Sequence, residues 1–165
     1  MLKHFAVLFS AIAMASALPA TAQDADEIAR VRSGEPCQGC NLFQANLAYR
    51  DLPETNVANA RLRQANLSLA TMNGSSFRNA NLSVANLFGA RFTGASFARA
   101  NLERATLVGA YFGGADMTGA NLAGANLSGA DLRTAKGLTQ EQLSVACGDA
   151  STRLPSGLSV PRCRR

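Results

Sequence analysis

From Cys40 onward, apolar residues recur at every fifth position of the chain. Cutting the sequence there gives CNLFQ, ANLAY, RDLPE and TNVAN, and the same frame continues without a slip to ADLRT at 130–134. The third position of all nineteen segments is Leu, Phe, Met or Val, and the first is Ala in fifteen of them. An α-helix turns roughly 500° in five residues and would not gather these side chains on one stripe. A straight strand would send them alternately to opposite faces.

A chain that turns a corner after every five residues keeps all of these side chains inside. Four corners close a square coil of twenty residues, and successive coils then stack about 4.8 Å apart through strand-like backbone hydrogen bonds. Residues twenty apart should therefore form columns, and two of the four columns of third positions consist of leucine alone. All Phe and Met residues of this position fall in the other two columns. The sequence thus predicts an all-β solenoid of nearly five coils.

The A(N/D)LXX pattern of residues 40–134 resembles the pentapeptide-repeat family. The resemblance implies the fold of that family, a right-handed quadrilateral β-helix. The end coils of such a solenoid invite edge-to-edge aggregation, and both flanks are typical of helical caps. Residues 24–31 (DADEIARV) combine early acids with an apolar face, and Thr139 followed by Gln142 forms a capping-box pattern. We expect short helices over 24–31 and over about 139–147.

The first 22 residues have the features of a secretory signal peptide. A charged start precedes an apolar stretch, and Ala20 and Ala22 form a small-residue cleavage pattern. An uncleaved membrane anchor is the alternative, although the apolar run is short for a span. We expect cleavage after Ala22, an N-terminal cap over 23–39, the β-helix over 40–134, and a helical cap with a disulfide-closed tail over 135–165. The mature protein is then periplasmic or secreted in a bacterium and has no transmembrane span.

All four cysteines follow the predicted cleavage point: Cys37, Cys40, Cys147 and Cys163. An even number of cysteines in an exported chain indicates disulfides. The CxxC motif at 37–40 also fits a redox motif or half of a zinc site. However, the sequence lacks a thioredoxin-like βαβ context, and nearly five coils separate the two cysteine pairs. We therefore favour structural disulfides, paired 37–40 and 147–163.

The sequence offers little for catalysis. Its single histidine, His4, lies in the predicted leader, so the mature chain has no imidazole for proton transfer or metal binding. The repeats contain no nucleophile–base pair or phosphate loop, and a solenoid with a filled interior provides no cleft for a carboxylate pair. We expect no enzyme activity, no cofactor and no metal. The asparagines of the second position are expected to form a hydrogen-bonded ladder that supports the turns.

Four apolar residues stand out among the outward positions. Leu69, Phe88 and Val108 fall on the second face in the twenty-residue register, and Val84 falls at the adjoining corner. Together they predict an exposed apolar patch, a feature that often marks a site of partner binding or self-association. Scattered surface hydrophobic residues are the alternative explanation.

Four arginines form the second candidate surface. Arg78 and Arg99 fall on the fourth face, Arg104 on the first and Arg91 on the third. Such a surface would attract anionic components of the cell envelope, although a solvated charged surface explains the same pattern. The repeats carry eight Arg and five acidic residues, a net charge of +3, unlike the strongly acidic relatives in the family that mimic DNA. Nucleic-acid binding is not expected, because no series of aromatic stacking residues accompanies the arginines.

The sequence therefore predicts an exported, non-enzymatic protein-interaction or structural module. Its expected partner is an unknown protein or a second copy of the chain, bound through the apolar patch. Binding of an anionic envelope component through the arginines is the alternative.

Overall fold

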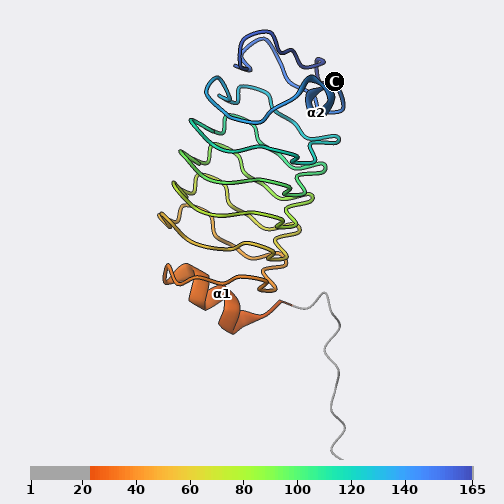
Figure 1. The fold of residues 1–165 in the computed structure, drawn as a ribbon. Helices are drawn as coiled ribbons and strands as arrows, with labels where there is room; N and C mark the ends of the chain where they lie inside the picture. The colour runs from red at the N-terminus through yellow and green to blue at the C-terminus, as the bar shows by residue number, and fades with distance from the viewer. Residues whose placement is uncertain (1–22, 165) are drawn as a thin grey trace, which may run out of the picture.

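The computed structural model describes residues 23–164. The predicted signal peptide and its cleavage after Ala22 lie outside the described residues. Between a helix at each end, the chain forms a stack of coils (Figure 1). Neither helix of the described part of the chain is long and apolar enough to cross a membrane.

Parallel β-bridges join residues twenty apart along the repeats. They form four columns, one on each side of the stack, and each bridge within the repeats involves the second residue of a repeat. The bridges are isolated single-residue pairs, so residues 23–164 contain no longer strand. This register is the one that the third-position columns predict. The columns begin at Asn41↔Arg61, Asn46↔Asn66, Asp51↔Thr71 and Asn56↔Ser76.

The third residue of each repeat lies inside the stack. All of these residues are buried, and none has more than 3% of its surface exposed. Four phenylalanines pack together at the centre. The ring centroid of Phe92 lies 5.6 Å from that of Phe77, 5.0 Å from Phe97 and 5.3 Å from Phe112. The first-position alanines are buried as well, because they lie where the inner backbone is crowded.

A left-handed backbone residue closes each turn of the coil. Every fifth residue from Gln44 to Gly129 has a φ angle between 54° and 68°, which explains why glycine fills most of these positions in the later repeats. Asparagine at the second position supports the same turn, because its side-chain oxygen accepts a hydrogen bond from the backbone N–H two residues on. The predicted ladder of asparagines forms in part, with amide–amide bonds from Asn86 to Asn66 and from Asn121 to Asn101.

Helix α1, Ala25–Arg32, covers the first coil. Asp24 is its N-cap, and Ile28 and Val31 are buried in the core. The Arg32 guanidinium donates from Nε and Nη2 to the main-chain oxygen of Asn46, at 3.1 and 2.9 Å. The helix thus satisfies part of the open edge of the first coil, at the place where a cap was predicted.

Helix α2, Gln140–Ser144, covers the other end and is shorter than the sequence predicts. The capping box between Thr139 and Gln142 is present. The Gln142 amide also donates to the main-chain oxygens of Met117 and Ala120, at 3.0 and 2.8 Å. The helix does not extend to 147, because Cys147 returns to the solenoid and pairs with Asn126 in a further parallel bridge.

One disulfide lies at each end of the stack. Cys37 is bonded to Cys40, and Cys147 is bonded to Cys163. The first pair is buried beneath α1, whereas both cysteines of the second pair are half-buried. The second disulfide ties the C-terminal tail to the last coil, where the Thr152 hydroxyl donates to the main-chain oxygen of Leu127 at 3.0 Å.

Candidate functional site

The bridge register places every fourth repeat on the same side of the stack, and one side has no charge. All eight arginines and all five acidic residues of 40–134 lie on the other three faces. The repeats therefore build one neutral side on a chain whose formal net charge is +5. We call this side the second face; it consists of residues 45–49, 65–69, 85–89, 105–109 and 125–129.

The predicted apolar residues lie on or beside the second face. Leu69 and Phe88 are 45% and 48% exposed, and Val108 is half-buried. Val84, which is 43% exposed, ends the repeat that precedes Ala85 and so lies at the corner of the face. Leu69 and Phe88 are neighbours across adjacent coils, because the Leu69 amide donates to the main-chain oxygen of Phe88 at 2.8 Å.

Tyr49 extends this row of apolar residues and was not among the residues predicted from the sequence. It is 76% exposed, the largest exposed fraction among the large hydrophobic residues of the described chain. It also lies twenty residues before Leu69, in the same column. This spacing of twenty residues from Leu69 is the sequence signal that could have revealed Tyr49. The apolar stripe of the second face therefore comprises Tyr49, Leu69, Phe88 and Val108, with Val84 at its corner.

Three members of this set have backbone conformations that their side chains disfavour. Tyr49, Leu69 and Val84 have φ angles of 60°, 57° and 59°. The left-handed region costs an L-residue about 1–2 kcal/mol, and a β-branched residue is rarely found there. The Leu69 side chain lies against Gly89 of the next coil, whereas Tyr49 and Val84 are exposed. Seven other non-glycine residues of these turns have the same conformation, so what distinguishes the three is their apolar side chain.

The four candidate arginines lie exposed on three faces and do not form one cluster. The Arg91 guanidinium lies over the Tyr111 ring, 5.6 Å from its centroid. Arg91 therefore takes part in a local cation–π contact. The side-chain stems of Arg99 and Arg104 each run beside a glycine of the next coil. Arg78 lies near enough to Asp116 to help lower the pKa of that carboxyl, after the larger effect of the hydrogen bonds from Thr118.

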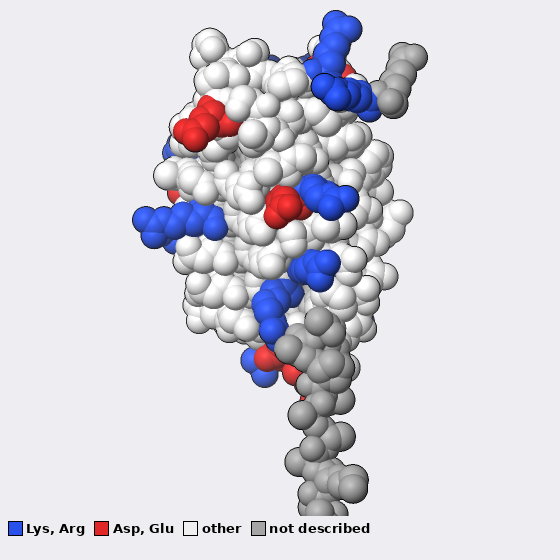
Figure 2. Space-filling model, turned by 90° about the vertical axis from the view of Figure 1, so that its right-hand side faces the viewer, with Lys and Arg blue, Asp and Glu red and all other residues white. Residues whose placement is uncertain are grey.

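Figure 2 shows basic and acidic side chains interspersed over one flank of the stack. Both ion pairs among the described residues involve Asp131. Its Oδ2 lies 2.7 Å from Nη2 of Arg133 and 3.9 Å from Nη1 of Arg153. The hydrogen bond from the Arg133 side chain is the main cause of the lowered pKa of Asp131. These carboxylates thus take part in local turns and pairs, and the structure brings no two of them together in a cleft.

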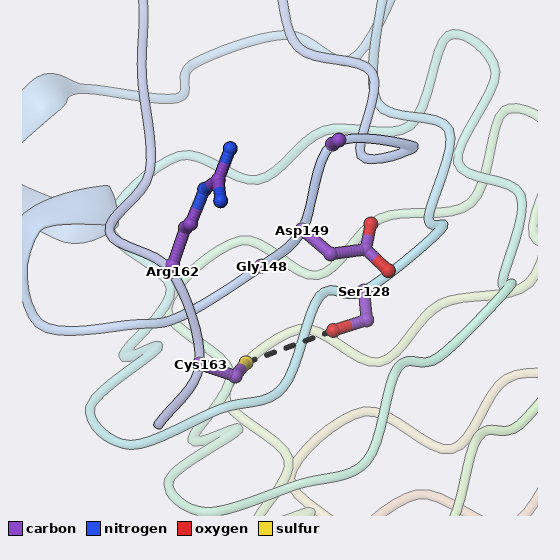
Figure 3. Close-up of a pocket in the computed structure, with 6 residues that line it drawn as sticks. Ser128, Gly148, Asp149, Arg162 and Cys163 are labelled. Carbon is purple, nitrogen blue, oxygen red and sulfur yellow. Dashed lines mark hydrogen bonds between the residues drawn. The ribbon is translucent and has the colours of Figure 1, made fainter. Parts of the chain in front are cut away.

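Two hollows border the ends of the second face. One, of about 200 Å³, lies beside α1 and is lined in part by Arg32, Gln44 and Asn46. The other, of about 400 Å³, lies under the C-terminal tail and is lined in part by Ser128 and Arg162. Figure 3 shows the second hollow, in which the Asp149 carboxylate points toward Ser128 while the Arg162 side chain extends away from it.

Asp149 anchors the tail at this hollow. Its Oδ1 accepts hydrogen bonds from the amides of Gly129, Ser151 and Thr152 and from the Ser151 hydroxyl. The Ser151 hydroxyl, followed by the Gly129 amide, lowers the pKa of Asp149 to about 2. Because folding lowers this pKa, the anchor stabilises the folded state fully above about pH 4, and the contribution is lost as the pH falls toward 2.

We expect Asp149→Asn to remove this pH dependence. The urea midpoint of the wild type should exceed that of the variant at pH 6, and the two should converge between pH 4 and pH 2. The pKa values of Asp116 and Asp131 are also lowered. Because both groups are present in the two proteins, their contributions cancel in the comparison. A difference that stays constant over the whole range would contradict the assignment.

A stack of four-sided coils closed by two caps defines a β-solenoid repeat protein. Residues 40–79, 65–103 and 95–133 match the family model of pentapeptide repeats, with 8 copies. The chain belongs to the pentapeptide-repeat family, as its five-residue pattern predicts. Proteins of this family form right-handed quadrilateral β-helices.

Several solved structures of this family are similar to the chain. A pentapeptide repeat protein from the thylakoid lumen of Arabidopsis thaliana is 33% identical, with 58% of this chain and 70% of that chain covered and a TM-score of 0.48. HetL from Nostoc sp. strain PCC 7120, involved in heterocyst differentiation regulation, is 31% identical over 70% of this chain and 51% of that chain, with a TM-score of 0.45. Another Nostoc member is 25% identical over 83% and 88% of the two chains, with a TM-score of 0.47. No match was found among curated proteins.

Proposed function

We propose that this chain is an exported, non-catalytic interaction module and that its second face binds a partner protein. The observation that carries the proposal is the combination on one face: no charged residue, and a stripe of exposed apolar side chains. Interface cores are depleted in charge and enriched in aromatic residues. The second face has both properties, in Phe88 and Tyr49.

The apolar residues at the left-handed position support the same function. Glycine fits the left-handed position without strain and fills it in most later repeats. Apart from Tyr49, Leu69 and Val84, every other residue at this position from Gln44 to Gly129 is Gly or polar. A binding role explains why apolar residues stand at these partly exposed turns, where polar residues or glycine serve elsewhere.

We further infer that nineteen repeats over 40–134 complete nearly five coils, flanked by caps over 23–39 and 135–165. The two disulfides support export, because such bonds persist in oxidising compartments. The apolar start of the sequence supports a leader that is removed after Ala22 and delivers the protein to the periplasm or the medium.

Substituting Phe88 tests the proposed function. Phe88→Asp places a carboxylate in the apolar stripe and is expected to reduce capture of a partner from envelope extract by at least about tenfold, as for an interface hot spot. Asn79→Asp is the matched control, because it adds the same carboxylate at an exposed position of the fourth face, on the opposite side of the stack. Capture is quantified by mass spectrometry, and folding is checked by far-UV circular dichroism.

Two further variants separate the alternatives. Leu69→Gly relieves the strained backbone, so it should retain the stability of the wild type and still lose capture. If a combined Arg78, Arg99 and Arg104 to Ala variant loses capture while Phe88→Asp retains it, the binding surface is the arginine surface and the partner is anionic. Equal capture by all variants would exclude both surfaces.

A further inference from the structure

We infer that the second face receives an amphipathic α-helix of a partner protein, laid along the axis of the solenoid and flanked by acidic residues. The inference rests on the proposed function and specifies the chemistry of the partner. Three features of the face carry it: the spacing of its apolar side chains, its length, and the charges at its border.

The spacing of the stripe favours a helix over a strand. Tyr49, Leu69, Phe88 and Val108 supply one apolar side chain per coil, so they follow each other at about the 4.8 Å coil spacing. An α-helix along the same axis presents one apolar side chain per turn of 5.4 Å, close to this spacing. An extended strand presents same-side residues about 6.7 Å apart, so it would fall out of step within two coils.

The length of the face sets the length of the helix. Four coil spacings separate Asn46 from Asn126, a rise of about 19 Å. About 13 residues of α-helix span this distance. The hollows at the two ends of the face, beside Asn46 and beside Ser128, leave room for the helix termini.

The positions directly beside the face carry only positive charge, at Arg50 and Arg104, whereas Asp51 and Glu103 lie one position further out. Arg32 is held at the N-terminal end of the face by the bonds to Asn46, Arg50 directly follows Tyr49, and Arg104 directly precedes the repeat that contains Val108. Arg162 borders the C-terminal hollow, where Asp149 is the one acidic residue that lines it. All four arginines are exposed. A partner whose apolar centre is flanked by carboxylates complements this border.

A second copy of the chain fits this face poorly. An interface between two second faces would set the same arginine border against itself. The face is also small, on the order of 250 Å² from its height and the width of one side, whereas a stable interface buries about 800 Å² per partner. The same estimate predicts that the complex with a helix is transient.

A synthetic peptide tests the inference on the full protein with intact disulfides. The probe has 16 residues in an Ala/Gln background, about the length derived above, with Leu at i, i+4, i+7 and i+11 and two Glu at each end. Binding is measured by NMR titration of backbone amides. We expect shifts at Leu69, Gly89 and Val108, and an affinity at least about tenfold lower for Phe88→Asp, with Asn79→Asp on the fourth face unchanged.

Charge reversal provides the second comparison. A peptide with Lys at both ends should bind at least about fivefold more weakly at low salt, and Arg104→Glu should weaken the Glu-ended peptide while Arg78→Glu, on the fourth face, leaves it unchanged. Equal binding of both peptides, or shifts outside the second face, would overturn the inference. Dimerisation that Phe88→Asp abolishes, seen by analytical ultracentrifugation, would assign the face to a second copy. In both cases the proposed function stands if Phe88→Asp still loses capture of the partner from envelope extract.

Discussion

Replacing Phe92 with alanine is expected to lower the free energy of unfolding by about 3–5 kcal/mol. The side chain is fully buried and contacts the rings of three other phenylalanines from its own column and the neighbouring one. Its removal leaves a cavity that the coil cannot close by collapsing. The backbone on both sides is fixed, since the Phe92 amide donates to Tyr111 and the adjacent Arg91 amide donates to Ala70.

The measurement is urea unfolding followed by far-UV circular dichroism, with disulfides intact. Phe92→Leu is the matched control and should cost much less, because leucine occupies the third position in most other repeats and fits the same turn. Because each coil contacts only its neighbours, the loss should also lower cooperativity in the middle of the stack. A loss below about 1 kcal/mol for Phe92→Ala would show that the cavity is filled by rearrangement.

The path of the coil could be predicted from the sequence because its cause is local. Each side of the coil needs an apolar residue that points into the core, a residue that tolerates a left-handed backbone, and a small residue at the corner. These needs repeat every five positions, so the period and the columns follow from the residues alone. The end of α2 could not be predicted in this way. It depends on Cys147 pairing with Asn126, a contact between the tail and the last coil that no local pattern reveals.

The candidate surface was predictable in part. Leu69 stood out because glycine fills its column in the later coils, and Phe88 because Ser68 and Ser128 occupy its column. Tyr49 did not, because the fifth positions of the first repeats are Gln44, Tyr49, Glu54 and Asn59, which contain no glycine against which to compare it. The absence of charge on the second face is a property of a whole column of repeats. It becomes visible only when the residues are sorted by face instead of along the chain.

Removing the C-terminal disulfide, by Cys147→Ser with Cys163→Ser, is expected to cost about 3 kcal/mol, because the bond closes a loop of about 15 residues. The sequence separation of the two cysteines is 16. The loss of stability should first affect the C-terminal tail. In the folded protein, the backbone of Arg153 is bonded to Ala130 and Leu132, and that of Cys163 to Gly148. Without the disulfide, the tail is held by these bonds, by the Asp149 anchor, by the hydrogen bonds between Gln140 and Ser159, and by Leu154, Leu158 and Val160 packed against the core.

Limited trypsin digestion measures the release of the tail. Cleavage after Arg153 should accelerate in the double variant while the repeats stay intact, because the core of each coil does not depend on the tail. The control is Cys37→Ser with Cys40→Ser. It removes a disulfide between cysteines only three residues apart in sequence, so it should cost less stability. That control should leave cleavage after Arg153 unchanged. If both variants release the tail equally, the ends of the solenoid are coupled through the whole stack, and the nearest-neighbour description of its stability is wrong.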